Sequence, residues 1–112
     1  MTKAPITTHI LDLHTGKPAS GINVKLFSPN SQILLTQAVS DKEGRIDVWT
    51  NDIVLSHGIW KLEFETKIWF YNQERDSFFS DIHLRFNIVK IDQHYHVPLL
   101  LNEFGYSSYR GS

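Results

Sequence analysis

The sequence predicts an all-β protein, an antiparallel sandwich or barrel with one short helix. About eight short segments alternate apolar and polar residues, which is typical of strands that bury one face. Turn signals rich in Gly, Pro, Asp, Asn and Ser separate these segments at roughly even spacing. The length, 112 residues, suits one hydrophobic core and not two. We therefore expect residues 1–112 to form a single domain.

The first half of the chain contains four predicted strands. Residues Ile6–Leu13 are β-branched and apolar with polar interruptions, and they stop at the turn signal His14–Pro18. Residues Ile22–Phe27 alternate strictly, and a break at residues 28–31 is short enough for a hairpin to the next predicted strand, Ile33–Val39. After another turn, residues Arg45–Trp49 alternate again.

The second half begins with the most regular strand pattern, Gly58–Glu65, in which every second residue is Trp, Leu or Phe and is expected in the core. Residues Thr66–Arg75 predict one short helix with Thr66 as its cap. Asp81–Val89 reads as a strand. From His94 onward we expect a terminal hairpin with a turn near Phe104-Gly105.

The composition excludes several functional classes. Eleven basic and twelve acidic residues give no electrostatic footprint for nucleic acid or for an anionic membrane. The lack of cysteine excludes disulfides, thiolate catalysis and cysteine zinc sites. No apolar run has the roughly twenty residues of a membrane span. The first five residues have no apolar signal core, so we expect a cytoplasmic protein, or a periplasmic one if a signal segment has been removed.

Histidine and arginine are the candidate chemical groups. His9 lies inside a predicted strand, where a lone histidine is more often structural than catalytic. His94 and His96 are two residues apart and share one face of an extended segment, so they suit a metal, catalysis or no role at all. Together with Arg45 they predict general acid–base chemistry on an anionic or carbonyl-rich substrate. Neither a glycine-rich phosphate loop nor a serine nucleophile elbow occurs, and the residues alone predict no particular reaction.

Three segments carry a resemblance to a known family. They are Thr8–Asp12 followed by Gly16–Ala19, then Asp41–Arg45, and finally His94–Ser112 with its terminal tetrapeptide Tyr109–Ser112. These segments resemble the 5-hydroxyisourate hydrolases, the transthyretin-related enzymes of purine breakdown. The resemblance implies a transthyretin-like sandwich of two four-stranded antiparallel sheets with one short helix. It also implies a homotetramer, a dimer of dimers, with sites in the channel between dimers.

The resemblance also implies a reaction and its residues. The family opens 5-hydroxyisourate by hydrolysis at the N1–C6 bond to give 2-oxo-4-hydroxy-4-carboxy-5-ureidoimidazoline, without cofactor or metal. His9 and His96 would serve as general base and proton shuttle, Arg45 would hold the anionic edge or the oxyanion, and Ser112 would orient a histidine or the water. The expected catalytic residues are thus His9, Arg45, His96 and Ser112, and the expected substrate-binding residues are Arg45, Tyr109, Arg110, Gly111 and Ser112.

Two other functions are considered beside the hydrolase. One is a non-enzymatic transthyretin-like protein that binds a small ligand; transthyretin, however, has lysine, glutamate and threonine at the places of His9, Arg45 and Tyr109. The other is a histidine-dependent metal-binding module. The chain also departs from the family pattern, because Asn102-Glu103 stands where the family usually has Ser-Pro, and Ser108 where Thr is common. His94 is expected to have a structural or supporting role.

Overall fold

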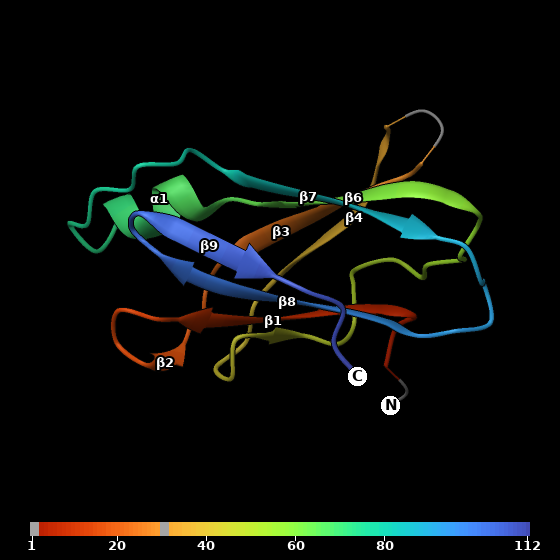
Figure 1. The fold of residues 1–112 in the computed structure, drawn as a ribbon, viewed down its shortest axis with the longest axis horizontal. Coiled ribbons are helices and arrows are strands. Elements are labelled where there is room, and N and C mark those ends of the chain that lie inside the picture. Colours follow the sequence, from red (N-terminus) through yellow and green to blue (C-terminus); the bar gives the residue numbers. More distant parts are fainter. Residues whose placement is uncertain (1–2, 30–31) are drawn as a thin grey trace.

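The computed structural model describes residues 3–29 and 32–112, and it consists of two β-sheets packed face to face with one short helix at one end (Figure 1). One sheet has the strand order β2-β1-β8-β9, with β5 also paired to β1, and the other has the order β4-β3-β6-β7. The elements are β1 (Ile6–Asp12), β2 (Lys17–Pro18), β3 (Asn23–Phe27), β4 (Leu34–Val39), β5 (Arg45–Ile46), β6 (Gly58–Phe64), α1 (Thr66–Tyr71), β7 (Ile82–Ile88), β8 (Tyr95–Asn102) and β9 (Gly105–Ser108).

The predicted two-sheet sandwich with one helix is confirmed, with two differences of detail. The first sheet has five strands and not four, because Lys17-Pro18, predicted within a turn, pairs with the end of β1 while β5 pairs with its middle. The pairing of β1 with β8 is parallel and not antiparallel, with Ile6 opposite Tyr95 and Asp12 opposite Leu101. A parallel pair needs a long connection between its strands, and here the whole second sheet supplies it. Residues 30–31 of the predicted break at 28–31 lie outside the described residues.

The core lies between the sheets, where the alternation of the strands predicts it. The predicted core face of β6, Trp60, Leu62 and Phe64, is at most 1% exposed. It packs in the same buried cluster as Ile10 and Leu99 of the opposite sheet. Burying each such side chain contributes roughly 1.5–3 kcal/mol. The alternation also turns the other residues of β1 and β8 outward, away from this core.

Strand β5 is shorter than the predicted Arg45–Trp49. It ends at Ile46, and the chain then leaves the sheet, so that Val48 is exposed. Its approach to β1 depends on Gly44, which has a φ of +75°. A Cβ atom there would clash with the carbonyl oxygen of Ile10, so only glycine allows the two backbones to come this close. The contact places Arg45 directly opposite His9.

The helix α1 is confirmed but ends at Tyr71 rather than near Arg75. Glu65 and not Thr66 occupies the N-cap position, and the Thr66 hydroxyl donates instead to the carbonyl of Ser80. Phe70 is buried in the core, and Trp69 Nε1 donates to the carbonyl of Ser20 at 2.8 Å. Within the described ranges no helix is long and apolar enough to cross a membrane.

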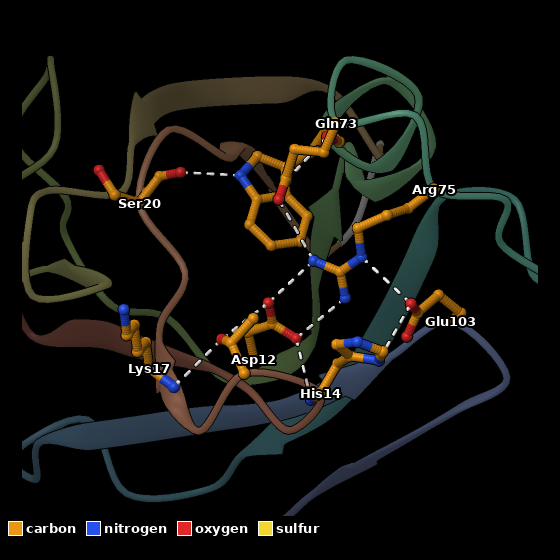
Figure 2. A network of polar contacts seen from close by, with 9 residues as sticks. Asp12, His14, Lys17, Ser20, Gln73, Arg75 and Glu103 are labelled. Carbon is orange, nitrogen blue, oxygen red and sulfur yellow. Dashed lines mark hydrogen bonds and ion pairs between the residues drawn. The ribbon is translucent and has the colours of Figure 1, made fainter.

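A network of charges fastens the turn of the β8–β9 hairpin to the end of β1 (Figure 2). The guanidinium of Arg75 donates two hydrogen bonds to the Asp12 carboxylate, at 2.9 and 3.1 Å, and one to Glu103 at 3.1 Å. His14 Nδ1 lies 3.3 Å from the same Glu103 carboxylate. Asn102 Oδ1 accepts hydrogen bonds from the backbone N–H groups of Phe104 and Gly105. Of the two residues that depart from the family pattern, Asn102 therefore shapes the turn, and Glu103 links it to Arg75.

Candidate active site

Three neighbouring strands bring the expected catalytic residues together on the outer face of the first sheet. The parallel register sets Thr7 of β1 opposite His96 of β8, and His9 opposite Pro98. On the other side of β1, Arg45 of β5 is opposite His9. Adjacent strands lie about 4.8 Å apart, and His96 is two positions before Pro98, so Arg45, His9 and His96 form a diagonal row across three strands. Segments far apart in the sequence therefore meet at one place.

A pocket of about 300 Å³ opens on this face beside the two histidines. Arg45 borders His9 on the neighbouring strand and is not among the residues that line the pocket. The floor comes from outward-facing residues of β1 and β8, and the wall comes from the last four residues of the chain. The lining residues are His9, Leu11, His96, Pro98, Leu100, Tyr109, Arg110, Gly111 and Ser112.

The C-terminal tail, residues 109–112, reaches the pocket because it continues along β8 after β9 ends. Ser108 Oγ donates to the carbonyl of Pro98 at 2.7 Å, and Gly111 N–H donates to the carbonyl of His96 at 2.8 Å. A Cβ atom at Gly111 would lie 2.6 Å from Cδ2 of the His96 ring. The tail backbone therefore packs directly against the imidazole, and only glycine fits at that point. Figure 1 shows the tail ending on the β1 side of the sandwich, in the half away from α1.

Of the other tail residues, Arg110 bonds back to the protein, whereas Tyr109 and Ser112 lie at the rim of the pocket. The guanidinium of Arg110 donates to Gln93 Oε1 and to the His94 carbonyl, both at 3.1 Å, and it stacks 4.3 Å over the Tyr95 ring. Arg110 thus lines the pocket while its charged group fastens the tail to the start of β8. Tyr109 and Ser112 are exposed at the rim of the pocket.

His96 is held by a residue that sequence reasoning missed, Thr7. The Thr7 hydroxyl lies 2.7 Å from Nδ1 of His96 and 3.1 Å from Nε2 of His94. The two imidazoles are stacked, with ring centres 6.4 Å apart. They share a face, as their spacing predicted. Thr7 reads as an ordinary strand residue in the sequence, and its only signal is the two-residue spacing to His9, which puts both on the outer face.

The surroundings of His96 favour its neutral form. Burial lowers the pKa of this imidazole below its usual value of 6.5, and electrostatic repulsion from the basic side chains of His94, Arg45 and His9 lowers it further. The carboxylate of Asp47 opposes these effects. One oxygen of Asp47 is buried and has no hydrogen-bond partner among the described residues. A neutral imidazole beside a pocket can accept a proton at neutral pH.

A metal site would need more donors than His94 and His96 supply. Across residues 3–29 and 32–112, no group of three or more His, Cys, Asp or Glu side chains is arranged to hold a metal ion. A nitrogen of each of these two imidazoles is directed at the Thr7 hydroxyl.

Comparison with known proteins gives consistent results. The model of the HIUase/Transthyretin family matches residues 6–111. A 5-hydroxyisourate hydrolase from Salmonella dublin is 40% identical over 109 residues, which cover 96% of this chain and 80% of that protein. The structure of Klebsiella pneumoniae 5-hydroxyisourate hydrolase superposes with a TM-score of 0.84 at 37% identity, covering 96% of this chain and 98% of that one.

Transthyretin itself shares the fold at lower sequence identity. Sea bream transthyretin in complex with thyroxine superposes with a TM-score of 0.89 at 25% identity and covers 96% of this chain and 95% of its own. The sandwich with an imidazole-lined pocket on its outer sheet face defines a transthyretin-like protein with acid–base groups. The chain belongs to the HIUase/Transthyretin family.

Proposed function

We propose that this protein hydrolyses 5-hydroxyisourate at the pocket between β1, β8 and the C-terminal tail. The observation that carries the proposal is the row of Arg45, His9 and His96 beside a pocket walled by the tail. Two similar proteins, from Salmonella dublin and Klebsiella pneumoniae, are 5-hydroxyisourate hydrolases. Their similarity extends over nearly the whole chain, so it covers every residue of the row.

The mechanism we propose is direct attack by water. Neutral His96 removes a proton from water as the oxygen adds to C6 of the substrate, and the oxyanion that forms is stabilised by Arg45. The N1–C6 bond then breaks, and the departing nitrogen takes a proton from an imidazole, with His9 as the second proton carrier. The product carries a carboxylate. Ser112, at the rim, orients the water or an imidazole with its hydroxyl or its carboxylate.

The substrate decays in water on its own, so the test compares rates of decay. 5-Hydroxyisourate is generated from urate by urate oxidase, and its ultraviolet absorbance is followed with and without this protein. We expect catalytic amounts of the protein to accelerate the decay strongly. A decay rate equal to that in buffer, with folded protein present, would reject the proposal.

The alternative is a ligand-binding protein without activity, which the likeness to thyroxine-bound transthyretin raises but which the higher identity to the two hydrolases disfavours. The two functions predict opposite results in a pair of measurements. Stoichiometric binding of thyroxine together with an unchanged decay rate would favour the binding protein. Accelerated decay without thyroxine binding is what we expect, since His9, Arg45 and Tyr109 suit a small polar substrate better than an iodinated hormone.

We also propose that the chain assembles as a dimer of dimers. Strands β7 and β9 each pair with one neighbouring strand among the described residues, so each of the two sheets has an open edge there. Open edges of this kind favour pairing with another chain. Light scattering on the purified protein tests the assembly: we expect four times the mass of one chain, and a monomer at micromolar concentration would contradict it.

A further inference from the structure

The contacts of His96 raise a question that the proposed mechanism leaves open. This imidazole must accept a proton and later release it, yet burial and repulsion from its basic neighbours disfavour its doubly protonated form. Thr7 lies directly behind it, only 1% exposed, with its hydroxyl within hydrogen-bond distance of both His96 and His94. His94 is exposed to solvent. A continuous chain of polar atoms therefore leads from the pocket through Thr7 to water.

The hydroxyl of Thr7 couples the tautomers of the two histidines. A hydroxyl has one proton to donate and lone pairs with which to accept. In one arrangement the Nδ1–H of His96 donates a hydrogen bond to the Thr7 oxygen, and the Thr7 hydroxyl donates one to Nε2 of His94. In the other arrangement the Nε2–H of His94 donates a hydrogen bond to the Thr7 oxygen, and the Thr7 hydroxyl donates one to Nδ1 of His96. In the first arrangement Nε2 of His96 is a free base, and in the second it carries a proton and is an acid.

We propose that Thr7 is a positioning residue of the hydrolase, which holds His96 as a base toward the pocket and links it to His94 as a proton relay. The proposal rests on the hydrolase function proposed above. It assigns a role to His94, which the mechanism otherwise does not use. No described residue is hydrogen-bonded to Nε2 of His96, which leaves that nitrogen for water and substrate.

The relay conserves protons over one turnover. Nε2 of His96 takes a proton from the attacking water, while Nδ1 passes its proton to Thr7 and Thr7 passes its own to Nε2 of His94. His94 releases its Nδ1 proton to solvent. The return step gives the Nε2 proton of His96 to the nitrogen that leaves C6, the two transfers through Thr7 reverse, and His94 takes one proton back from solvent. His96 thus acts as base and then as acid without keeping two protons.

The charged groups around the relay come from three other parts of the sheet. His9 lies on β1, Arg45 lies on β5, and Asp47 follows β5; all three act on the charge of His96. Arg110 of the tail bonds to the carbonyl of His94. None of them is hydrogen-bonded to the Thr7 hydroxyl among the described residues, so a change at Thr7 alters the relay and leaves these charges in place.

The first test replaces the hydroxyl and keeps the shape. We expect Thr7→Val to lower kcat by roughly ten- to a hundredfold, the range of a general acid–base contribution, with a much smaller change in KM. Thr7→Ser keeps the hydroxyl and should retain most of the activity. Thr8→Val is the matched control: its buried hydroxyl donates to the Val97 carbonyl at 2.6 Å and touches no imidazole, so kcat should stay close to that of the natural protein.

The second test reads the tautomers directly and needs no activity. ¹⁵N NMR of the histidines should find His96 protonated mainly at Nδ1, and Thr7→Val should shift it toward Nε2. His94→Phe, at an exposed position, should remove the outer half of the relay and lower kcat without a further loss in combination with Thr7→Val. An unchanged His96 tautomer in Thr7→Val would overturn the proposal, and so would a Thr7→Ser variant as impaired as Thr7→Val. It would also be overturned if the reductions in kcat of Thr7→Val and His94→Phe multiplied in the double variant, because the two residues would then act independently. If the natural protein does not hydrolyse 5-hydroxyisourate, the NMR result still decides whether Thr7 sets the tautomer.

Discussion

The imidazole of His96 is held on two sides, which leaves one nitrogen for chemistry. Thr7 bonds Nδ1 from the strand beside it, and the backbone at Gly111 packs against Cδ2. The remaining nitrogen, Nε2, belongs to a ring that lines the pocket. A fixed ring orientation is what a general base needs, because proton transfer depends on hydrogen-bond geometry before it depends on pKa. The last residues of the chain therefore support the site as well as border it.

Gly111→Ala tests the contribution of the tail to this orientation. The new methyl group would lie 2.6 Å from the His96 ring, so either the tail or the ring must move. Because a shift of about 1 Å can cost on the order of a hundredfold in rate, we expect kcat/KM to fall by at least about tenfold. Thermal stability should change little, since the substitution lies at the chain end. Steady-state kinetics and thermal denaturation measure the two effects.

Gly105→Ala is the matched control for this experiment. Gly105 belongs to the same terminal hairpin, but a Cβ atom there meets no atom within 4 Å. Its activity should remain close to that of the natural protein. Equal losses for both variants would mean that the hairpin as a whole, and not the contact with His96, limits the activity.

The lowered pKa of His96 predicts the acid limb of the pH–rate profile. The neutral base is the active form, and it persists until the pH falls through the lowered pKa of the imidazole. We therefore expect kcat/KM to retain more than half of its plateau value at pH 6.5 and to fall to half of it only at a lower pH. A midpoint of the acid limb at or above pH 6.5 would show that another group, or an unshifted histidine, controls the rate.

The positions of single site residues could be predicted from the sequence where these residues belong to a recognisable motif. The spacing of the terminal histidines placed both on one face, as the structure confirms. The family resemblance selected His9, Arg45 and His96, which the strand register then brings together. Thr7 could not be predicted, because its role arises from a partner 89 residues away and a threonine in a strand looks like any other.

At the scale of elements, Arg75 links the segment after α1 to the end of β1 and to the turn between β8 and β9, which are far apart in the sequence. Its ion pairs reach the end of β1 and the turn between β8 and β9 (Figure 2). Burial would raise the pKa of Asp12, but the hydrogen bonds from Arg75 and from the His14 N–H outweigh it, so the pKa of Asp12 is lowered. Arg75 also lowers the pKa of Glu103. The hairpin that carries the tail is thereby fastened to the strand that carries His9.

Arg75→Leu should destabilise the protein substantially. It leaves the Asp12 carboxylate, only 3% exposed, without its cation, and breaking a buried ion pair in this way costs roughly 3–5 kcal/mol. Chemical denaturation measures the loss. As a control, Lys25→Ala removes a more exposed ion pair with Glu65, at 3.6 Å, and should change stability by less than about 1 kcal/mol.

Acid should reduce the difference between Arg75→Leu and the natural protein. Asp12 and Glu103 have lowered pKa values, so their contribution is complete above their usual values of 3.8 and 4.5 and is lost as the pH falls through the lowered ones. The two stabilities should therefore converge below about pH 4. A difference that stayed constant from pH 7 to pH 3 would show that packing, and not charge, accounts for the effect of Arg75.

Elements were predictable where the alternation of apolar residues is regular. Strands β3, β6 and β7 have nearly the predicted bounds, because each buries one face against the core. Alternation gave the wrong end for β5, because the length of this strand depends on the close contact that Gly44 makes with β1. The parallel pairing of β1 with β8 has no local signal at all, since it joins the two ends of the chain.

At the scale of the whole molecule, the core and the site occupy opposite faces of the same sheet. Residues of β1 that face inward hold the sandwich together, while the alternating residues lie on the outer face, where His9 and Leu11 line the pocket. Substitutions on the outer face can therefore change the chemistry with little effect on the core. This separation makes variants of the site residues interpretable.

The rate of 5-hydroxyisourate decay with His96→Ala shows whether His96 is the base of the reaction. The natural protein should accelerate the decay, and His96→Ala should lower turnover by at least about a hundredfold while the circular dichroism spectrum and the melting temperature stay the same. His9→Ala and Arg45→Ala should show losses of the same order. A folded His96→Ala protein with nearly natural turnover would contradict the account, because the base at the centre of the site would then not be needed.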